Sequence, residues 1–387
     1  MSGSKGFFGR PQPAAVLKHE ILRRYVVVFA SKTGSQSAGR VGYIDGYAGA
    51  GSYEDGTPGS PALMIEAATT IGAFRQIRMS FVESDRDTYE KLVQLVAAND
   101  TDGMDIRVMY GSVEEHLDAI LQATGDDPLF VFLDPFGVGI DFEVLTQKIL
   151  GRSRNNRPKT EVLLNFSVQA VDRIGGLIKT AAKSRTKTLE RLDRTLGGDW
   201  WQPLYSSHTG PERTAAIANE YRARVSAAAG GWGGWTVPVS DSINGRPEYL
   251  LMHFTQHPDG RWEFYQAMTF ATEEWRKACY EANPRDEDKL AALGQFPLEG
   301  FEAPVPFEED TSAWVQEIMS NATRLLDEGA SFVLQDRLRD LLGRALGLAR
   351  ETHVRQALKP LWKAGRLAEE PKGSLQRYGF APAKATT

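Results

Sequence analysis

The sequence predicts an α/β fold in which a parallel sheet is covered by helices on both faces, followed by a smaller C-terminal domain. Two observations lead to this prediction. Short apolar runs alternate with amphipathic, helix-length segments as far as residue 166, and the pattern changes after an acidic, proline-containing stretch at 297–310. We expect an N-terminal helix and loop at 1–40, a sheet domain at 41–300 with a helical basic insertion around 171–228, a connector at 301–330 and a C-terminal domain at 331–387.

Each expected element rests on its own periodicity. The first helix, at 15–30, places apolar side chains at helical spacing. Later strands are expected from 41 onward and at 78–82, 106–109, 129–133 and 161–166, with helices at 61–73, 89–98 and 113–123. Beyond these, 229–240 is typical of a loop or sheet edge, and 249–256 and 261–270 are typical of a strand or a strand and helix.

The composition narrows the class of protein. With 42% hydrophobic and 25% charged residues, the chain is typical of folded globular proteins. The single cysteine, Cys279, excludes an internal disulfide framework and a cysteine-based metal site, and the six histidines have no metal-ligand spacing, so we expect no metal site built on cysteine or histidine. The chain contains no run of about 18 apolar residues and no apolar leader segment, which favours a cytoplasmic protein without a membrane partner.

The net charge of −5 is unevenly distributed. Residues 331–387 hold 11 Lys and Arg against 5 Asp and Glu, and residues 151–195 hold 11 against 4. An acidic chain with two basic segments indicates local anion-binding faces rather than a generally basic surface.

The first predicted strand runs into the turn YIDGYAGAG, which contains Asp45, Tyr47, Ala48, Gly49 and Gly51. Glycines let the backbone turn sharply and approach a ligand, and the following helix offers free amides at its N-terminus. This turn is therefore a candidate cofactor-binding loop.

The next strand ends carry suitable side chains in the same order. Glu83 and Ser84 follow the second strand, and a carboxylate at that place accepts hydrogen bonds from both hydroxyls of a ribose. Gly111 and Ser112 follow the third strand and could flank an adenine ring. Together with the glycine turn, these residues predict a Rossmann-like nucleoside pocket at the carboxyl ends of the strands.

The fourth strand ends in FLDPFG, and the fifth ends near Asn165. The series resembles the motifs of class I methyltransferases, whose D-x-F-A-G-x-G turns bind S-adenosylmethionine (SAM) and whose D-P-P-Y loops hold a target amine. The resemblance implies that Asp134 accepts a hydrogen bond from the amine and that Phe136, after Pro135, stacks on a flipped base. We expect Asn165 to face the same pocket.

A closer resemblance covers nearly the whole chain. The segments DGYAGAGSYEDGTPGSP, FVESDRDTYEKL, FLDPFGVGIDFEVL and LLNFSVQAV, with the C-terminal segment, resemble the three-Cys-motif partner protein (TcmP) family. This resemblance implies a class I methyltransferase-like sheet and a radical-SAM-like partner protein with a three-cysteine motif.

The last segment predicts a winged-helix-like domain. A helix around 332–346, a second helix after the N-cap candidate Thr352, and a short strand at 376–380 make up the pattern. We expect basic side chains here and in the insertion to contact the phosphates of DNA or RNA without reading sequence. These are Lys179, Lys183, Arg185, Lys187, Arg355, Lys359, Lys363, Lys372 and Arg377.

Three functions stay open from the sequence. The first is a SAM-dependent methyltransferase acting on nucleic acid, and the second is a subunit that binds nucleic acid for a radical-SAM repair or modification enzyme without transferring methyl groups. The third is a nuclease-like protein in which Asp45, Glu54, Asp55, Glu83 and Asp134 hold Mg²⁺ or Mn²⁺.

Overall fold

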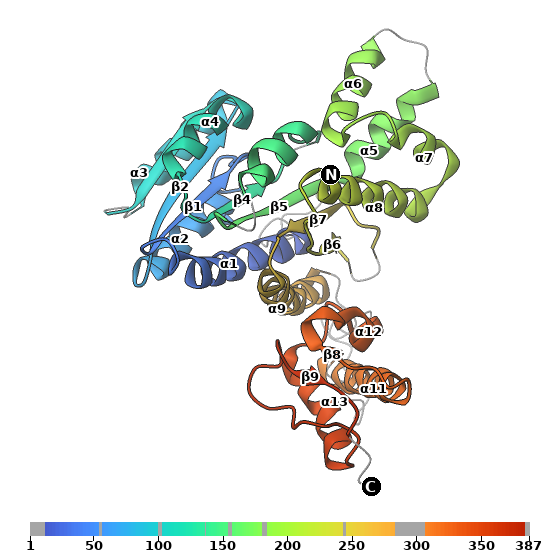
Figure 1. Ribbon diagram of the computed structural model, residues 1–387. Helices are drawn as coiled ribbons and strands as arrows, with labels where there is room; N and C mark the ends of the chain where they lie inside the picture. The colour runs from blue at the N-terminus through green and yellow to red at the C-terminus, as the bar shows by residue number, and fades with distance from the viewer. Residues whose placement is uncertain are drawn as a thin grey trace, which may run out of the picture. The chain divides into compact units, whose positions relative to one another are not determined.

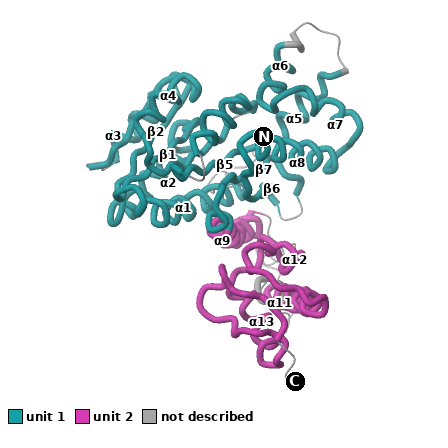
Figure 2. Tube along the Cα trace, in the orientation of Figure 1, with its two compact units in different colours: residues 1–261 teal, residues 262–387 magenta. Residues whose placement is uncertain are grey.

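The computed structural model describes two compact units, Met1–Arg261 and Trp262–Thr387 (Figure 2). The described residues are 12–53, 56–99, 103–135, 137–153, 157–179, 184–242, 245–282 and 306–383; the side chains at 179, 184–186 and 306–310 are not covered. Within this part of the chain, no helix combines the length and the apolar character that crossing a membrane requires.

The first unit is built on a seven-stranded sheet (Figure 1). Its strands are β1 (Arg40–Asp45), β2 (Gln76–Glu83), β3 (Asp105–Tyr110), β4 (Leu129–Leu133), β5 (Thr160–Ser167), β6 (Thr236–Val239) and β7 (Tyr249–Phe254). The order is β3-β2-β1-β4-β5-β7-β6. The first five strands are mutually parallel, whereas β7 runs antiparallel to both β5 and β6. The predicted alternating α/β pattern is confirmed.

Helices connect these strands and cover the sheet. They are α1 (Pro13–Gly34), α2 (Ser60–Gly72), α3 (Arg86–Ala98), α4 (Val113–Thr124), the turns η1 (Val144–Ile149) and η2 (Leu150–Arg152), α5 (Val168–Gly175), η3 (Gly176–Lys179), α6 (Ser184–Leu196), α7 (Trp201–Ser207) and α8 (Gly210–Ala228). The predicted helices at 15–30, 61–73, 89–98 and 113–123 are confirmed, and the segment 171–228 is largely helical as expected.

Two different cores lie on the two faces of the sheet, because side chains alternate along each strand. On one face, Ile44 and Val131 pack with apolar residues of α4, η1, α5 and α8. On the other face, Tyr43 and Phe130 stack at 6.3 Å, and Phe130 also contacts Tyr25 and Phe29 of α1. Helices therefore cover both faces, as predicted.

A buried polar network fixes α1 against the start of β5. The Glu161 carboxylate accepts hydrogen bonds from the Tyr25 hydroxyl, from the Thr255 hydroxyl at 2.7 Å and from His253 Nε2 at 3.2 Å. Burial is the main cause that lowers the pKa of His253. Because an unpaired carboxylate is costly to bury, this network sets the position of Tyr25 and of the residues one or two turns earlier in α1.

The chain after β7 forms a long helix, α9 (Pro258–Ala282), so the segment 261–270, expected as a strand or a strand and helix, is helical throughout. Trp262, Tyr265 and Met268 are buried at intervals of three residues, which suits one side of a helix. The run RWEFYQAMTF is rich in aromatic residues, so its composition mimics that of a strand.

The second unit contains α11 (Pro306–Asp327), β8 (Phe332–Val333), α12 (Leu338–Leu342), α13 (Glu351–Lys363) and β9 (Gly379–Phe380). The expected connector at 301–330 is wrong from Pro306 onward. Ile318, Ala322 and Leu325 are buried on one side of α11, so the segment is an amphipathic helix with acidic residues near its start. The predicted domain boundary at 297–310 lies mostly outside the described residues.

Two details of the expected C-terminal pattern are also wrong. The helix predicted at 332–346 is interrupted, because Leu334 donates its amide to Tyr378 O at 3.0 Å and Gly343 has a φ of +51°. The second helix begins at Glu351 rather than after Thr352, and the Arg350 amide donates to His353 Nδ1 at 3.0 Å. The predicted strand at 376–380 is reduced to β9, which pairs antiparallel with β8.

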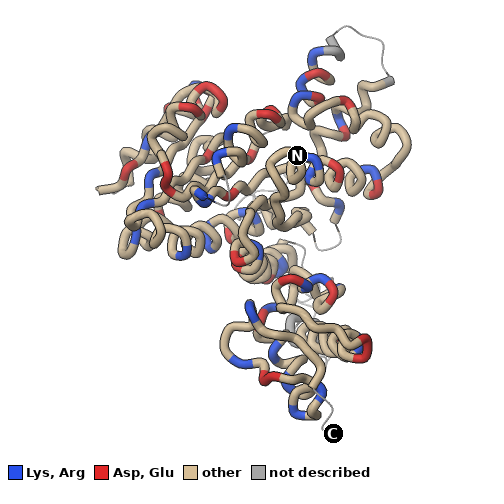
Figure 3. The backbone as a smooth tube through the Cα atoms, in the orientation of Figure 1, with Lys and Arg blue, Asp and Glu red and all other residues tan. Residues whose placement is uncertain are grey.

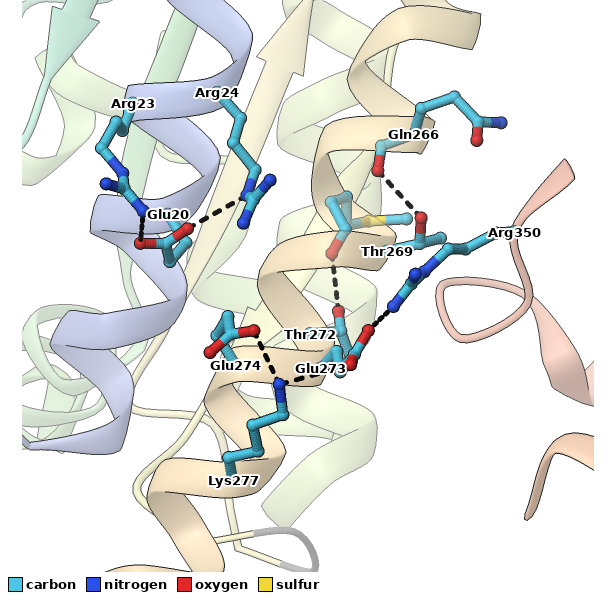
Figure 4. A network of polar contacts seen from close by, with 11 residues as sticks. Glu20, Arg23, Arg24, Gln266, Thr269, Thr272, Glu273, Glu274, Lys277 and Arg350 are labelled. Atoms are coloured by element: carbon cyan, nitrogen blue, oxygen red, sulfur yellow. Dashed lines mark hydrogen bonds and ion pairs between the residues drawn. The ribbon is translucent and has the colours of Figure 1, made fainter. Parts of the chain in front are cut away.

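Polar contacts join α9 to the segment before α13. Arg350 points at Glu273 of α9 and forms an ion pair with it (Figure 4). The Tyr265 hydroxyl donates to Ala349 O, and the rings of Phe332 and Phe380 stack at 4.7 Å. These contacts make the helix α9 part of the second unit.

Candidate functional site

The predicted site residues meet at one edge of the sheet. Asp45 ends β1, Glu83 ends β2, Asp134 follows β4, and Asn165 lies near the end of β5. These four strands are adjacent and parallel, so their carboxyl ends share an edge. The chain order reverses between β1 and β4, which is where doubly wound sheets bind ligands.

The glycine turn is held by Glu83. The Gly49 amide donates to Glu83 Oε2 at 2.9 Å, and the Asp85 amide donates to Oε1 at 2.7 Å. The Ala48 amide donates to Val82 O at 3.0 Å. The turn after β1 is therefore bonded to the end of β2, while neighbouring Ser84 is exposed.

Two glycines in this turn have a backbone that other residues rarely adopt. Gly49 has a φ of +66° and Gly51 a φ of +82°. A Cβ at Gly51 would lie 3.0 Å from Leu95, whereas a Cβ at Gly49 would meet no atom within 4 Å. Gly51 therefore allows close packing against α3, and Gly49 leaves open space above the turn.

Asp45 is fully buried beneath the turn. Its Oδ1 accepts from the Tyr47 amide at 3.3 Å, whereas Oδ2 has no partner among the described residues. Burial raises the pKa of Asp45 to about 7, and the nearby Asp134 charge acts in the same direction. Tyr47 packs on the sheet core, and burial raises the pKa of its hydroxyl.

Asp134 binds two side chains that converge from α1 and β5. Its Oδ2 lies 2.6 Å from Lys18 Nζ, and its Oδ1 accepts from Asn165 Nδ2 at 2.6 Å. Burial alone would lower the pKa of Lys18, but the charge of Asp134 together with nearby Tyr249 and Tyr53 raises it overall. The Asp134 carboxylate therefore favours the charged form of Lys18.

The helix α1 was predicted from the sequence, but the role of Lys18 as the partner of Asp134 was not. Lys18 Nζ lies 5.8 Å from the centroid of the Tyr249 ring, and the Tyr249 hydroxyl donates to Ala14 O at 3.0 Å. The adjacent His19 is neutral at pH 7, because burial first and the Lys18 charge second lower its pKa to about 4. No local sequence pattern predicts the Lys18–Asp134 pair, because the two residues lie 116 positions apart in the chain.

A small cavity of about 30 Å³ adjoins this cluster. It lies between residues 137–140, the end of β5 and the helices α5 and α6, and Asn165 contributes to its lining. The Asn165 Oδ1 is buried without a partner among the described residues. A cavity of this size has room for about one or two water molecules rather than a base.

The end of β3 differs from the expectation. Ser112 is the N-cap of α4: its Oγ accepts from the Glu115 amide at 3.3 Å, and Glu115 Oε2 accepts from the Ser112 amide at 2.8 Å. The Gly111 amide donates to Glu83 O at 3.0 Å. The neighbouring Tyr110 is 46% exposed, and its ring lies 5.5 Å from the Tyr89 ring and 5.2 Å from the Arg86 guanidinium.

Three predicted site residues lie outside the described residues: Phe136, and Glu54 and Asp55 of the metal hypothesis. Pro135 is buried next to Asp134. Across the described ranges, His, Cys, Asp and Glu side chains form no group that could hold a metal ion.

The predicted basic residues differ in their exposure and contacts (Figure 3 marks the charged positions). Lys187 on α6 and Lys359 and Lys363 on α13 are exposed, as are Lys372 and Arg377. Arg355 instead bonds Glu351 and the carbonyl of Gly373. Lys183 lies outside the described residues, and the side chains of Lys179 and Arg185 are among those not covered.

No protein-family model matches the sequence, and no curated protein matches it. A crystal structure of a Legionella pneumophila protein of the DUF519 family is similar to this chain with a TM-score of 0.27 and 14% sequence identity. The match covers 46% of this chain and 73% of that one. A likeness at this level carries no argument about fold or function.

Proposed function

We propose that the carboxyl edge of the sheet binds S-adenosylmethionine and that the protein is a SAM-dependent methyltransferase acting on nucleic acid. One observation carries the proposal: Glu83, at the end of β2, bonds the amide of Gly49 in the glycine turn. This places a carboxylate and a sharply turned backbone side by side at the switch point of the sheet, which suits a nucleoside.

The residues present fit this cofactor. Each carboxylate oxygen of Glu83 has a further lone pair for a ribose hydroxyl, and the space in front of Gly49 is open. The exposed ring of Tyr110 offers a stacking surface for a base. The antiparallel β7 between β5 and β6 supports the class I methyltransferase sheet that the resemblance implies.

The bound cofactor would supply an electrophilic methyl group, and Asp134 would hold the amine that receives it. Lys18 forms an ion pair with Asp134 Oδ2, and the carboxylate oxygens have further lone pairs that can accept from an amine N–H. Asn165 fixes the orientation of that carboxylate by donating to Oδ1. Pro135 and Phe136 would complete the loop at the target base.

The second unit supports a nucleic-acid partner. The helices α11, α12 and α13 with the two-stranded sheet of β8 and β9 support our winged-helix interpretation, and α13 carries Lys359 and Lys363 on its exposed side. Basic side chains there would contact DNA or RNA phosphates. The resemblance adds a radical-SAM-like three-cysteine-motif protein as a partner in a cytoplasmic setting.

The contacts of Asp134 favour a second function, in which the protein transfers no methyl group. Both of its oxygens already bind protein groups, Lys18 and Asn165. In this reading the protein is a subunit that binds nucleic acid for a radical-SAM repair or modification enzyme and transfers no methyl group. SAM binding without methyl transfer, together with co-purification of the partner, would favour this function.

Titration calorimetry with SAM and with its demethylated product tests the main proposal. We expect binding to the wild-type protein and its loss in Glu83→Ala. Glu66→Ala, which removes an exposed carboxylate from α2, is the matched control and should bind like wild type. Absence of heat with both ligands on folded wild-type protein would overturn the proposal.

A further inference from the structure

A group of arginines lies beside the loop that follows β4. Arg173, on α5, has a guanidinium nitrogen 3.7 Å from the position of a Cβ at Gly137, three residues after Asp134. The Arg173 side chain is exposed, and within the described ranges its guanidinium forms no ion pair or hydrogen bond. An arginine at the candidate catalytic loop therefore has its full set of donors available.

Asp172, the residue before Arg173, forms ion pairs with two more arginines. Arg246, from the loop before β7, forms an ion pair with Asp172, and Arg213 of α8 lies 3.8 Å from it. The Arg246 side chain is 55% exposed, whereas that of Arg213 is 21% exposed. Asp172 thus pairs with two arginines and Arg173 follows it in the chain, so the three arginines outnumber the one carboxylate and the group carries a net positive charge.

Arg213 and the surrounding helices fix this arrangement. The Arg213 guanidinium lies 4.0 Å from the centroid of the Tyr205 ring, and its Nε donates to His208 O at 2.9 Å. The Tyr205 hydroxyl donates to Asp172 O at 3.0 Å. A Cβ at Gly175 would lie 2.2 Å from Tyr205, so α5 and α7 are packed in direct contact. Arg213 is thus a positioning residue, and Arg173 and Arg246 are the more exposed of the three arginines.

We propose that Arg173 and Arg246 bind a backbone phosphate of a single-stranded or flipped nucleotide whose base reaches the loop at Asp134. The inference rests on the proposed function and adds a substrate-binding site to it. Guanidinium groups match phosphate oxygens in charge and in the geometry of paired donors. The place of Arg173 next to Gly137 would fix the nucleotide beside the reacting loop without selecting its base.

Fluorescence anisotropy with short, labelled single-stranded oligonucleotides tests this site across a series of salt concentrations. Arg173→Ala is the main variant, because it removes no described protein contact. We expect its affinity to fall about tenfold, the scale of a lost charge-assisted hydrogen bond. The slope of log affinity against log salt should fall by about 0.7 for each lost phosphate contact on a single strand. Arg246→Ala should act in the same direction.

Arg107→Ala is the matched control, because it removes an exposed arginine from β3, at the far edge of the sheet from β5. DNA and RNA oligonucleotides form separate arms, and equal losses on both would assign the site to the shared phosphodiester. Unchanged affinity in Arg173→Ala, an equal loss in Arg107→Ala, or no oligonucleotide binding by the wild-type protein would overturn the inference. SAM calorimetry on the same variants separates the proposals: failure of SAM binding with intact arginine effects contradicts only the methyltransferase function.

Discussion

Lys18 Nζ lies 2.6 Å from Asp134 Oδ2, which joins the first helix of the chain to the candidate catalytic loop. Both side chains are largely buried, at 11% and 15% exposure. A charge in such a place requires its partner, because burying one alone is costly. Helix α1 is therefore part of the site rather than a separate N-terminal segment.

Replacing Lys18 by Met tests this pairing. The variant leaves the Asp134 carboxylate buried without its cation, so we expect the free energy of unfolding to fall by about 3 kcal/mol. Urea denaturation measures the change. Lys91→Met, which removes an exposed lysine on α3, should have little effect.

The double variant Lys18→Met with Asp134→Asn supplies the decisive comparison. It removes both charges, so it should recover much of the stability lost in Lys18→Met. If the two single changes were simply additive, the ion pair would not be what ties α1 to the loop.

The two glycines of the turn predict different effects on SAM binding and on stability. Gly49→Ala places a methyl group in open space, so it should weaken SAM binding at least tenfold while costing about 1 kcal/mol of stability through its positive φ. Gly51→Ala meets Leu95 in addition to the strained backbone, so it should lower the thermal midpoint further. Calorimetry with SAM and a thermal melt measure both quantities; equal SAM affinity in Gly49→Ala and wild type would contradict this role.

Asp45 predicts a dependence of stability on pH. Its pKa is about 7 in the folded protein against an ordinary value of 3.8, because the site is buried. Between pH 4 and pH 7 the unfolded chain loses this proton while the folded protein keeps it, so the free energy of unfolding falls as pH rises. The shift corresponds to about 4 kcal/mol.

Asp45→Asn removes this titration. We expect the stability of the variant relative to wild type to rise between pH 4 and pH 7 and to level off above about pH 8. Urea denaturation at several pH values follows the difference. A constant difference over the whole range would mean that Asp45 titrates normally.

The strand ends were predictable from sequence because they depend on local pattern. Apolar runs that end in Asp45, Glu83 and Asp134 place these residues on one edge of any parallel sheet. Lys18 was not predictable, because its role comes from a partner far along the chain. The structural role of Ser112 was predictable, because a Ser followed three residues later by Glu115 is the sequence pattern of a capping box at the start of a helix.

The C-terminal segment illustrates a different limit. Periodicity alone predicted one helix at 332–346. The first residues of that range instead form a strand, because Phe332 pairs with Phe380 in a small sheet. That pairing joins residues 48 positions apart, and tertiary contact overrides local propensity there. The acidic residues around 308–310 were interpreted as part of a connector because acidic, proline-containing segments are typical of connectors.

The exposed side of α13 predicts the behaviour of the second unit. Lys359 and Lys363 lie one turn apart and are exposed, whereas Val354 and Leu358 are buried. Replacing both lysines by Glu should weaken binding of duplex DNA or structured RNA and reduce its salt dependence, because two phosphate contacts become repulsive. Anisotropy over a salt series measures both effects.

Arg355→Ala is the contrasting variant. Arg355 bonds Glu351 and Gly373 O, so its loss should lower the thermal midpoint more than it lowers the affinity for nucleic acid. Unchanged nucleic-acid binding in the double Glu variant would exclude this face of α13 as the contact surface.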